Sequence, residues 1–132
     1  MATEKAKKAI GWFLAVSFIA IASLLIISYF KTNAELPLEN VLYYGEDCPH
    51  CKNVEAFMSE NNATSKISIT QKEVWYNQTN KAEFMSVVEY CGINPSKAGV
   101  PLFYTGGDED KACFAGDKDI INLLKAKLNI TG

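Results

Sequence analysis

The segment that decides the fold runs from residue 41 to residue 51 and reads VLYYGEDCPHC. Its first four residues are apolar and aromatic and are typical of a β-strand, which the glycine ends. Pro49 suits the first position of a helix, with Cys48 in the capping position before it. The following apolar residues keep helical spacing as far as about Asn61. The segment therefore predicts a strand that turns, through two cysteines three residues apart, directly into a helix.

Outward from this segment, the sequence predicts an α/β domain over residues 39–132. Gly, Pro and Asn separate short apolar runs, and two further stretches have apolar residues at helical spacing. The further elements are expected, in chain order, as a strand at 67–75, a helix from Asn80 to Gly92, strands at 100–104 and 111–114, and a helix from Gly116 onward. The order βαβ, α, ββ, α predicts a four-stranded mixed sheet, in which the first βαβ unit is parallel and the last two strands form a hairpin.

The N-terminal part of the chain differs from this domain, because no residue from 9 to 30 is charged. A helix needs about 20 apolar residues to cross the hydrocarbon layer of a bilayer. Trp12 and Tyr29 lie near the two ends, where amphipathic rings favour the interface. We therefore expect a cytoplasmic N-terminus at 1–8, a transmembrane helix at 9–30 with the lipid bilayer as its partner, and a tether at 31–38.

Lysines around this stretch predict its orientation. Lys5, Lys7 and Lys8 precede it, and only Lys31 follows closely. By the positive-inside rule the protein should be a single-pass protein of the cell membrane, with its N-terminus in the cytoplasm and its domain outside. Cleavage after Ala34, as in a secretory signal, stays open.

Overall charge excludes one class of partner. The formal net charge is −2, from 13 basic and 15 acidic residues, and every basic residue is lysine. Proteins that read nucleic acid favour the bidentate fork of arginine and a basic surface. A nucleic-acid partner is therefore not expected.

The chemistry of the chain is expected in Cys48-Pro49-His50-Cys51. A helix N-terminus offers free N–H groups and a partial positive charge to the Cys48 sulfur, and both stabilise a thiolate. His50 adds a hydrogen bond or, when protonated, a positive charge, so Pro49 and His50 should tune the redox behaviour. Because the thiolate is both nucleophile and leaving group in thiol exchange, the motif predicts that Cys48 exchanges and that Cys51 resolves.

A C-x-x-C motif also occurs in zinc sites and in c-type haem sites. A structural zinc site would need a second close pair of ligands, and a c-type haem would need histidine where Lys52 stands. No cofactor and no resident metal are therefore expected. A copper(I) chaperone that uses Cys48, His50 and Cys51 as soft ligands stays open, as does a binding module that keeps the fold without turnover.

From about residue 38 to residue 132 the predicted domain resembles the thioredoxin superfamily, at the size of a glutaredoxin. The resemblance rests on the strand before Cys48-Pro49-His50-Cys51, on the order of elements, and on Gly99-Val100-Pro101 ahead of a strand. The Pro-His dipeptide and Val100 resemble the bacterial, DsbA-like disulfide oxidases. The resemblance implies a cis-proline at Pro101 beside the cysteines, pairing of the Val100 backbone with substrate, and reoxidation by a membrane quinone-linked partner.

Departures from the family pattern concern the surroundings of the sulfur. Leu42 stands where thioredoxins usually carry a buried acid, and Asp47 replaces an aromatic residue before the motif. The negative charges of Glu46 and Asp47 should partly offset thiolate stabilisation. The function predicted is that of a thiol–disulfide oxidoreductase that oxidises protein dithiols outside the cytoplasm, and a disulfide reductase of the same fold stays open.

Two further cysteines lie outside the motif. Cys91 ends the apolar face of the second helix of the domain, and Cys113 lies in the expected fourth strand. Our hypothesis is that they form a structural disulfide. The alternative is two separate buried thiols that behave as small apolar residues.

Overall fold

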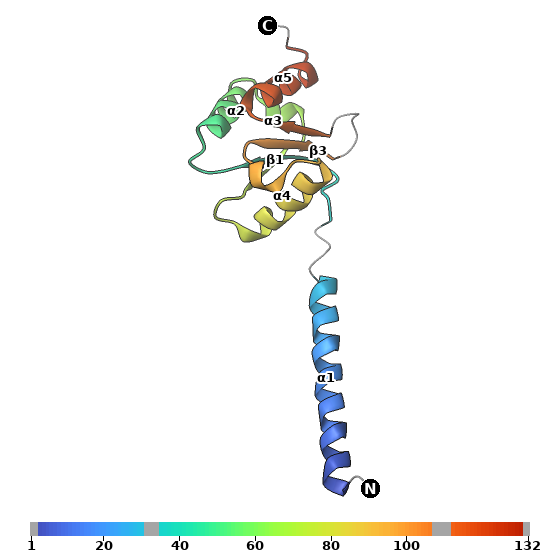
Figure 1. Ribbon diagram of the computed structural model, residues 1–132. Helices are drawn as coiled ribbons and strands as arrows, with labels where there is room; N and C mark the ends of the chain where they lie inside the picture. The colour runs from blue at the N-terminus through green and yellow to red at the C-terminus, as the bar shows by residue number, and fades with distance from the viewer. Residues whose placement is uncertain (1–2, 31–34, 107–111, 131–132) are drawn as a thin grey trace. The chain divides into compact units, whose positions relative to one another are not determined.

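The computed structural model describes residues 3–30, 35–106 and 112–130 (Figure 1). The chain divides into two compact units, Met1–Asn33 and Ala34–Gly132. The first unit contains helix α1 (Glu4–Phe30), and the second contains the α/β domain. Part of the expected tether, the candidate cleavage position Ala34 and the expected start of the fourth strand at residue 111 lie outside the described residues.

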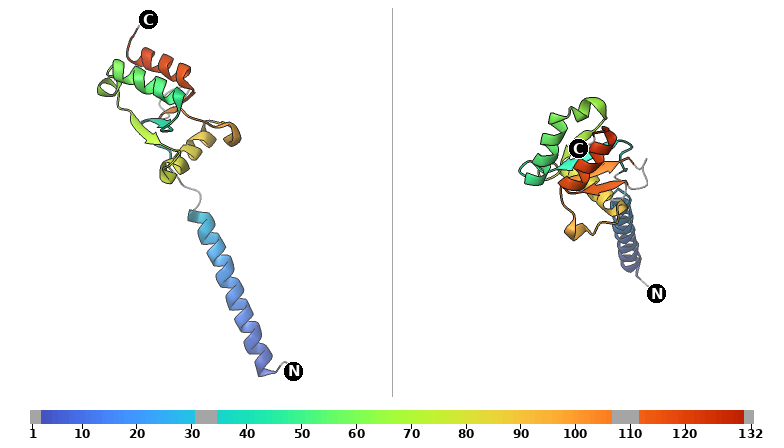
Figure 2. Two further views of the ribbon diagram at one scale, coloured as in Figure 1. Left: turned by 90° about the vertical axis from the view of Figure 1, so that its left-hand side faces the viewer. Right: turned by 90° about the horizontal axis from the view of Figure 1, so that it is seen from above.

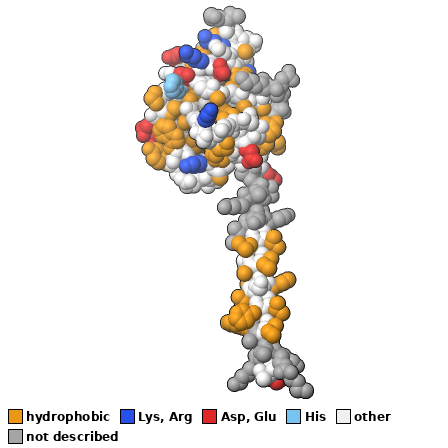
Figure 3. Space-filling model, viewed as in Figure 1, with side chains coloured by type: hydrophobic (Ala, Val, Ile, Leu, Met, Phe, Trp, Pro, Cys, Tyr) orange, Lys and Arg blue, Asp and Glu red, His pale blue; other side chains and the backbone are white. Residues whose placement is uncertain are grey.

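Helix α1 occupies the stretch for which the sequence predicted a membrane crossing, and that prediction is wrong. None of the helices in the described ranges is long and apolar enough to cross a membrane. The described side chains of the apolar stretch run from residue 10 to residue 26 and are exposed along the helix (Figure 3).

The domain is built on a four-stranded mixed sheet with the order β2-β1-β3-β4. Its strands are β1 (Asn40–Tyr44), β2 (Thr70–Glu73), β3 (Leu102–Thr105) and β4 (Cys113–Ala115). Strand β1 pairs in parallel with β2 and antiparallel with β3, and β3 pairs antiparallel with β4. The predicted parallel βαβ unit and the hairpin of the last two strands are therefore confirmed, and the sheet is compatible with a thioredoxin-like fold.

Helices cover both faces of this sheet (Figures 1 and 2). On one face lie α2 (Pro49–Glu60), α3 (Ala63–Lys66) and α5 (Asp117–Lys127), and on the other lies α4 (Gln78–Tyr90). Successive residues of β1 enter different cores, because side chains alternate along a strand. Leu42 packs with α2 and α5, whereas Val41 and Tyr43 pack with α4. Strand β1 is thus buried on both sides, and its end delivers the cysteine segment to the edge of the sheet.

The second strand is shorter than the predicted 67–75. Residues 63–66 form the short helix α3, and pairing with β1 begins only at Thr70. Beyond the strand, the carboxylate of Glu73 accepts hydrogen bonds from the backbone N–H groups of residues 75, 76 and 77 at 2.6–3.0 Å. Because these N–H groups are bound to the carboxylate, they cannot form the hydrogen bonds of a sheet. The chain therefore continues as a loop after Glu73.

Helix α4 begins at Gln78, two residues before the predicted start at Asn80. Its N-cap is Asn77, whose side chain accepts from the backbone N–H of Asn80 at 3.0 Å. The side chain of Asn80, at the expected start of the helix, donates to the backbone carbonyl of Glu73 instead. Gly92, with φ +65°, follows the end of the helix as predicted. An unpredicted 3-10 turn, η1 (Pro95–Lys97), comes next.

Candidate redox site

Two cysteines at the N-terminus of α2 are joined in a disulfide, and their Cα atoms are 5.2 Å apart. Cys48 is the N-cap of the helix and Pro49 follows at its first position, as the sequence indicated. Cys48 is 4 % exposed and Cys51 is fully buried. An incoming thiolate can therefore approach the sulfur of Cys48 more readily than that of Cys51.

Backbone hydrogen bonds hold Cys48 in place. Its N–H donates to the carbonyl of Gly45 at 3.1 Å, and its carbonyl accepts from the N–H of Lys52 at 3.1 Å. The N–H of Cys51 donates to the Cys48 Sγ at 3.2 Å. Because this donor belongs to the first turn of a helix, it is one of the N–H groups with no intrahelical partner. It would stabilise negative charge on the sulfur once the disulfide opens.

The residues before β3 complete one side of the site. The Val100–Pro101 peptide bond is cis, and the carbonyl oxygen of Val100 lies 3.6 Å from the Cys48 Sγ. Pro101 is fully buried, and its carbonyl accepts from the N–H of Gly116 at 2.9 Å. Of the two groove residues expected from the sequence, Val100 thus contacts the first cysteine through its carbonyl, and Pro101 follows it through the cis bond.

The imidazole of His50 lies at the surface and contacts a carboxylate from another helix (Figure 3). Its Nδ1 is 3.2 Å from the Oδ2 of Asp117, in the first turn of α5, and the side chain is 69 % exposed. Asn53 donates to the same Oδ2 at 2.7 Å. Hydrogen bonds from Asn53 and then from His50 lower the pKa of the Asp117 carboxyl. Asp117 was not anticipated as a partner of His50, because the sequence around Gly116 indicated only the start of a helix.

Replacement of Asp117 by asparagine should change how stability depends on pH. The pKa of this carboxyl is lower in the folded domain than in the unfolded chain, so its stabilising contribution is present above the ordinary aspartate range. The contribution is lost as the pH falls through the lowered folded value. We therefore expect the difference in unfolding free energy between the wild type and Asp117→Asn to shrink from about pH 5 to about pH 2.

Urea unfolding at several pH values measures this difference. Asp119→Asn is the matched control, because it makes the same change at an exposed position in the same first turn. A wild-type advantage over Asp117→Asn that stays constant with pH, or one that Asp119→Asn reproduces, would contradict the assigned hydrogen bonds.

Leu42, at the position where the resemblance to thioredoxins implied a departure from a buried acid, lies in an apolar core. Leu42 is fully buried in the core beneath α2 and α5, together with Val54 and Phe103. A leucine side chain neither accepts nor donates a proton. Proton transfer during opening of the disulfide therefore cannot pass through this position.

An aromatic loop borders the site and was not anticipated from the sequence. Trp75 packs so closely on Gly45 that a Cβ atom at Gly45 would overlap the indole ring. The hydroxyl of Tyr76 lies 3.5 Å from the Oδ2 of Asp47, next to the first cysteine. Glycine before the motif is the only local signal for this packing, because the close approach leaves no room for a side chain.

A second disulfide joins Cys91 to Cys113, whose Cα atoms are 6.0 Å apart. Cys91 is the C-cap of α4, and Cys113 is the first residue of β4. Both residues pack against the core on the α4 side of the sheet. This disulfide therefore ties the end of a helix to the edge strand of the sheet.

Within residues 3–30, 35–106 and 112–130, no group of three or more His, Cys, Asp or Glu side chains is arranged to hold a metal ion. No protein-family model matches the chain, and no curated protein matches it either. The candidate function therefore depends on the geometry of the cysteine site.

Proposed function

We propose that this protein is a thiol–disulfide oxidoreductase of the thioredoxin superfamily, which oxidises dithiols of protein substrates through its Cys48–Cys51 disulfide. One observation carries the proposal. The two cysteines form a disulfide at the start of α2, where the Cys48 Sγ lies between the N–H of Cys51 and the carbonyl of Val100. The four-stranded mixed sheet is compatible with this assignment.

The reaction proceeds in two exchanges. A substrate thiolate attacks the Cys48 Sγ, the Cys48–Cys51 bond breaks, and Cys51 leaves as a thiolate that takes up a proton. A second substrate thiolate then attacks the substrate sulfur of the mixed disulfide. The substrate disulfide forms, and Cys48 leaves as a thiolate stabilised by the N–H of Cys51. Two electrons have then passed from the substrate to the cysteine pair.

Substrate orientation and reoxidation complete the proposal. The backbone of Val100, which lies beside the reacting sulfur, would pair with an extended substrate segment. A membrane quinone-linked protein would reoxidise the reduced pair. The presence of two disulfides in one small domain favours an oxidising compartment outside the cytoplasm as the site of action.

The reduction potential of the Cys48–Cys51 couple tests the direction of electron flow. The reduced and oxidised fractions are measured by alkylation after equilibration in glutathione buffers. A Cys91→Ala/Cys113→Ala variant serves as a control that isolates the motif pair. We expect a value near −120 mV, as in strong protein oxidants. A value near −270 mV would instead assign the site to disulfide reduction.

None of the three alternatives, the copper(I) chaperone, the binding module and the disulfide reductase, gains a specific observation. In the copper(I) chaperone, Cys48, His50 and Cys51 would be the ligands, but these three described residues are not arranged as a group that could hold a metal ion, and the two cysteines are joined in a disulfide. The reductase uses the same site and the same atoms in the reverse order, so the measured potential decides between the two directions.

A further inference from the structure

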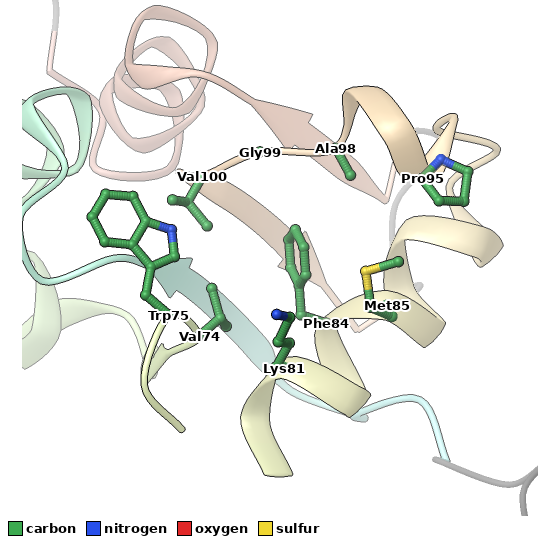
Figure 4. Close-up of a pocket in the computed structure, with 9 residues that line it drawn as sticks. All are labelled: Val74, Trp75, Lys81, Phe84, Met85, Pro95, Ala98, Gly99 and Val100. Atoms are coloured by element: carbon green, nitrogen blue, oxygen red, sulfur yellow. The ribbon is translucent and has the colours of Figure 1, made fainter. Parts of the chain in front are cut away.

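A pocket of about 340 Å³ opens beside Val100, on the face of the sheet that α4 covers (Figure 4). Its walls come from the end of β2 and the loop after it, from α4, and from the segment that leads to β3. The nine lining residues are Val74, Trp75, Lys81, Phe84, Met85, Pro95, Ala98, Gly99 and Val100. The carbonyl of Val100 also lies 3.6 Å from the Cys48 Sγ, so one residue of the pocket lining contacts the reacting sulfur.

The pocket lining is mostly apolar and contains one charged side chain. Val74 and Phe84 are buried and form the floor, whereas Trp75 and Met85 are more exposed and form part of the rim. The volume lies at the lower end of the range for ligand pockets, roughly 300–1,000 Å³, which suits one large side chain and its backbone. The pocket thus offers an apolar side chain a place to leave water.

Lys81 is the one charged residue among the nine that line the pocket. It is exposed, and within the described parts of the chain no carboxylate lies close enough to form a salt bridge with it. The nearby carboxylate of Glu83, on the same helix, is already bound by Lys72 at 2.7 Å and by the hydroxyl of Tyr43 at 2.6 Å. The charge of Lys81 is therefore left to interact with a bound ligand.

We propose that this pocket selects the protein substrates of the Cys48–Cys51 site by binding an extended segment that carries a large apolar side chain and an acidic residue close to the reacting cysteine. The apolar side chain enters the space between Val74, Phe84 and Val100, and the carboxylate pairs with Lys81. The inference rests on the proposed function, because it names the class of segment on which that exchange acts.

The test measures the exchange of Cys48 with a series of peptides. In a Cys51→Ser variant, the Cys48 thiolate attacks the sulfur of a peptide cysteine activated as a disulfide with thionitrobenzoate, and coloured thionitrobenzoate leaves. Each peptide carries a leucine beside the cysteine, and aspartate, asparagine or lysine at one of four positions on either side. At one or more positions we expect aspartate peptides to react about two- to fivefold faster than asparagine peptides, as for an exposed ion pair. Lysine peptides should be the slowest.

Charge reversal at Lys81 provides the decisive comparison. In Lys81→Glu the order of the exchange rates should invert, so that lysine peptides react fastest and aspartate peptides slowest. Lys66→Glu is the matched control, since it makes the same change at an exposed lysine of α3, on the opposite face of the sheet. Equal rates for all three peptide classes at every position, or the same inversion in Lys66→Glu, would overturn the assignment of Lys81.

A third variant tests the apolar part of the pocket. A Cβ atom at Gly99 would meet nothing within 4 Å, so a side chain can start at this position, and Gly99→Leu places a larger one at the pocket. Exchange with leucine peptides should fall at least fivefold relative to exchange with the small disulfide dithiobis(nitrobenzoate), and an unaltered ratio would overturn the pocket assignment. Absence of exchange with the small disulfide in the Cys51→Ser variant itself would instead reject the proposed function, and this inference with it.

Discussion

Replacement of Cys48 by serine is expected to abolish thiol–disulfide exchange with protein dithiols. Cys48 is the more exposed residue of the pair, and its sulfur accepts a hydrogen bond from the N–H of Cys51. A serine hydroxyl cannot form the mixed disulfide, so both exchanges of the mechanism lose their central atom. Oxidation of a reduced two-cysteine peptide, followed with a thiol reagent, measures the effect. The variant should show no more oxidation than the peptide without protein.

Cys51→Ser is the matched control for this result. It removes the other sulfur of the same disulfide but leaves the Cys48 thiolate. With a peptide cysteine activated as a disulfide with thionitrobenzoate, Cys48 should attack the peptide sulfur, release thionitrobenzoate and remain in a stable mixed disulfide with the peptide. Mass spectrometry of the trapped complex identifies the linked residue. Retention of turnover in Cys48→Ser, or a substrate trapped on a residue other than Cys48, would show that the roles of the two cysteines are wrongly assigned.

Removal of the second disulfide is expected to have the largest effect on stability. Cys91 and Cys113 are 22 residues apart, and cross-linking a loop of this length limits the unfolded chain. In the chain-entropy description this corresponds to about 3 kcal/mol. We expect Cys91→Ala/Cys113→Ala to lower the free energy of unfolding by about that amount, as measured by urea unfolding without reductant.

The motif pair provides the control for this prediction. Cys48 and Cys51 are only three residues apart, so Cys48→Ala/Cys51→Ala should cost about half as much by the same relation. An equal loss in the two double variants would mean that loop length is not the origin of the stabilisation. No loss in Cys91→Ala/Cys113→Ala would mean that the bridge does not restrain the unfolded chain.

The course of the backbone around the motif followed from neighbouring residues alone. Proline at the first helical position, a capping cysteine and an apolar run before glycine act over a few residues, so the strand, the disulfide turn and α2 lie where the sequence indicated. The start of α4 was less predictable. Asn77 and Asn80 are both good caps, and the carboxylate of Glu73 decided between them by binding the backbone N–H of Asn77.

The prediction for residues 9–30 shows that amino-acid composition can indicate a helix without indicating the surroundings of that helix. An uncharged stretch correctly predicted a helix, and α1 extends from Glu4 to Phe30. The inference from helix to membrane crossing was wrong, since no helix within the described residues meets the requirements of length and hydropathy together. Apolar composition favours a helix that avoids water but does not by itself specify what surrounds that helix.

Sequence alone determined the chemistry available to this protein: two cysteines at a helix start, a histidine between them and a proline segment elsewhere. Such features depend on dihedral preferences and capping, which adjacent residues control. Only the tertiary structure decided which groups surround the sulfur, because contacts such as His50 with Asp117 and Cys48 with Val100 join residues far apart in the chain. Those contacts arise from the packing of α5 and β3 against the rest of the domain, and no local pattern encodes that packing.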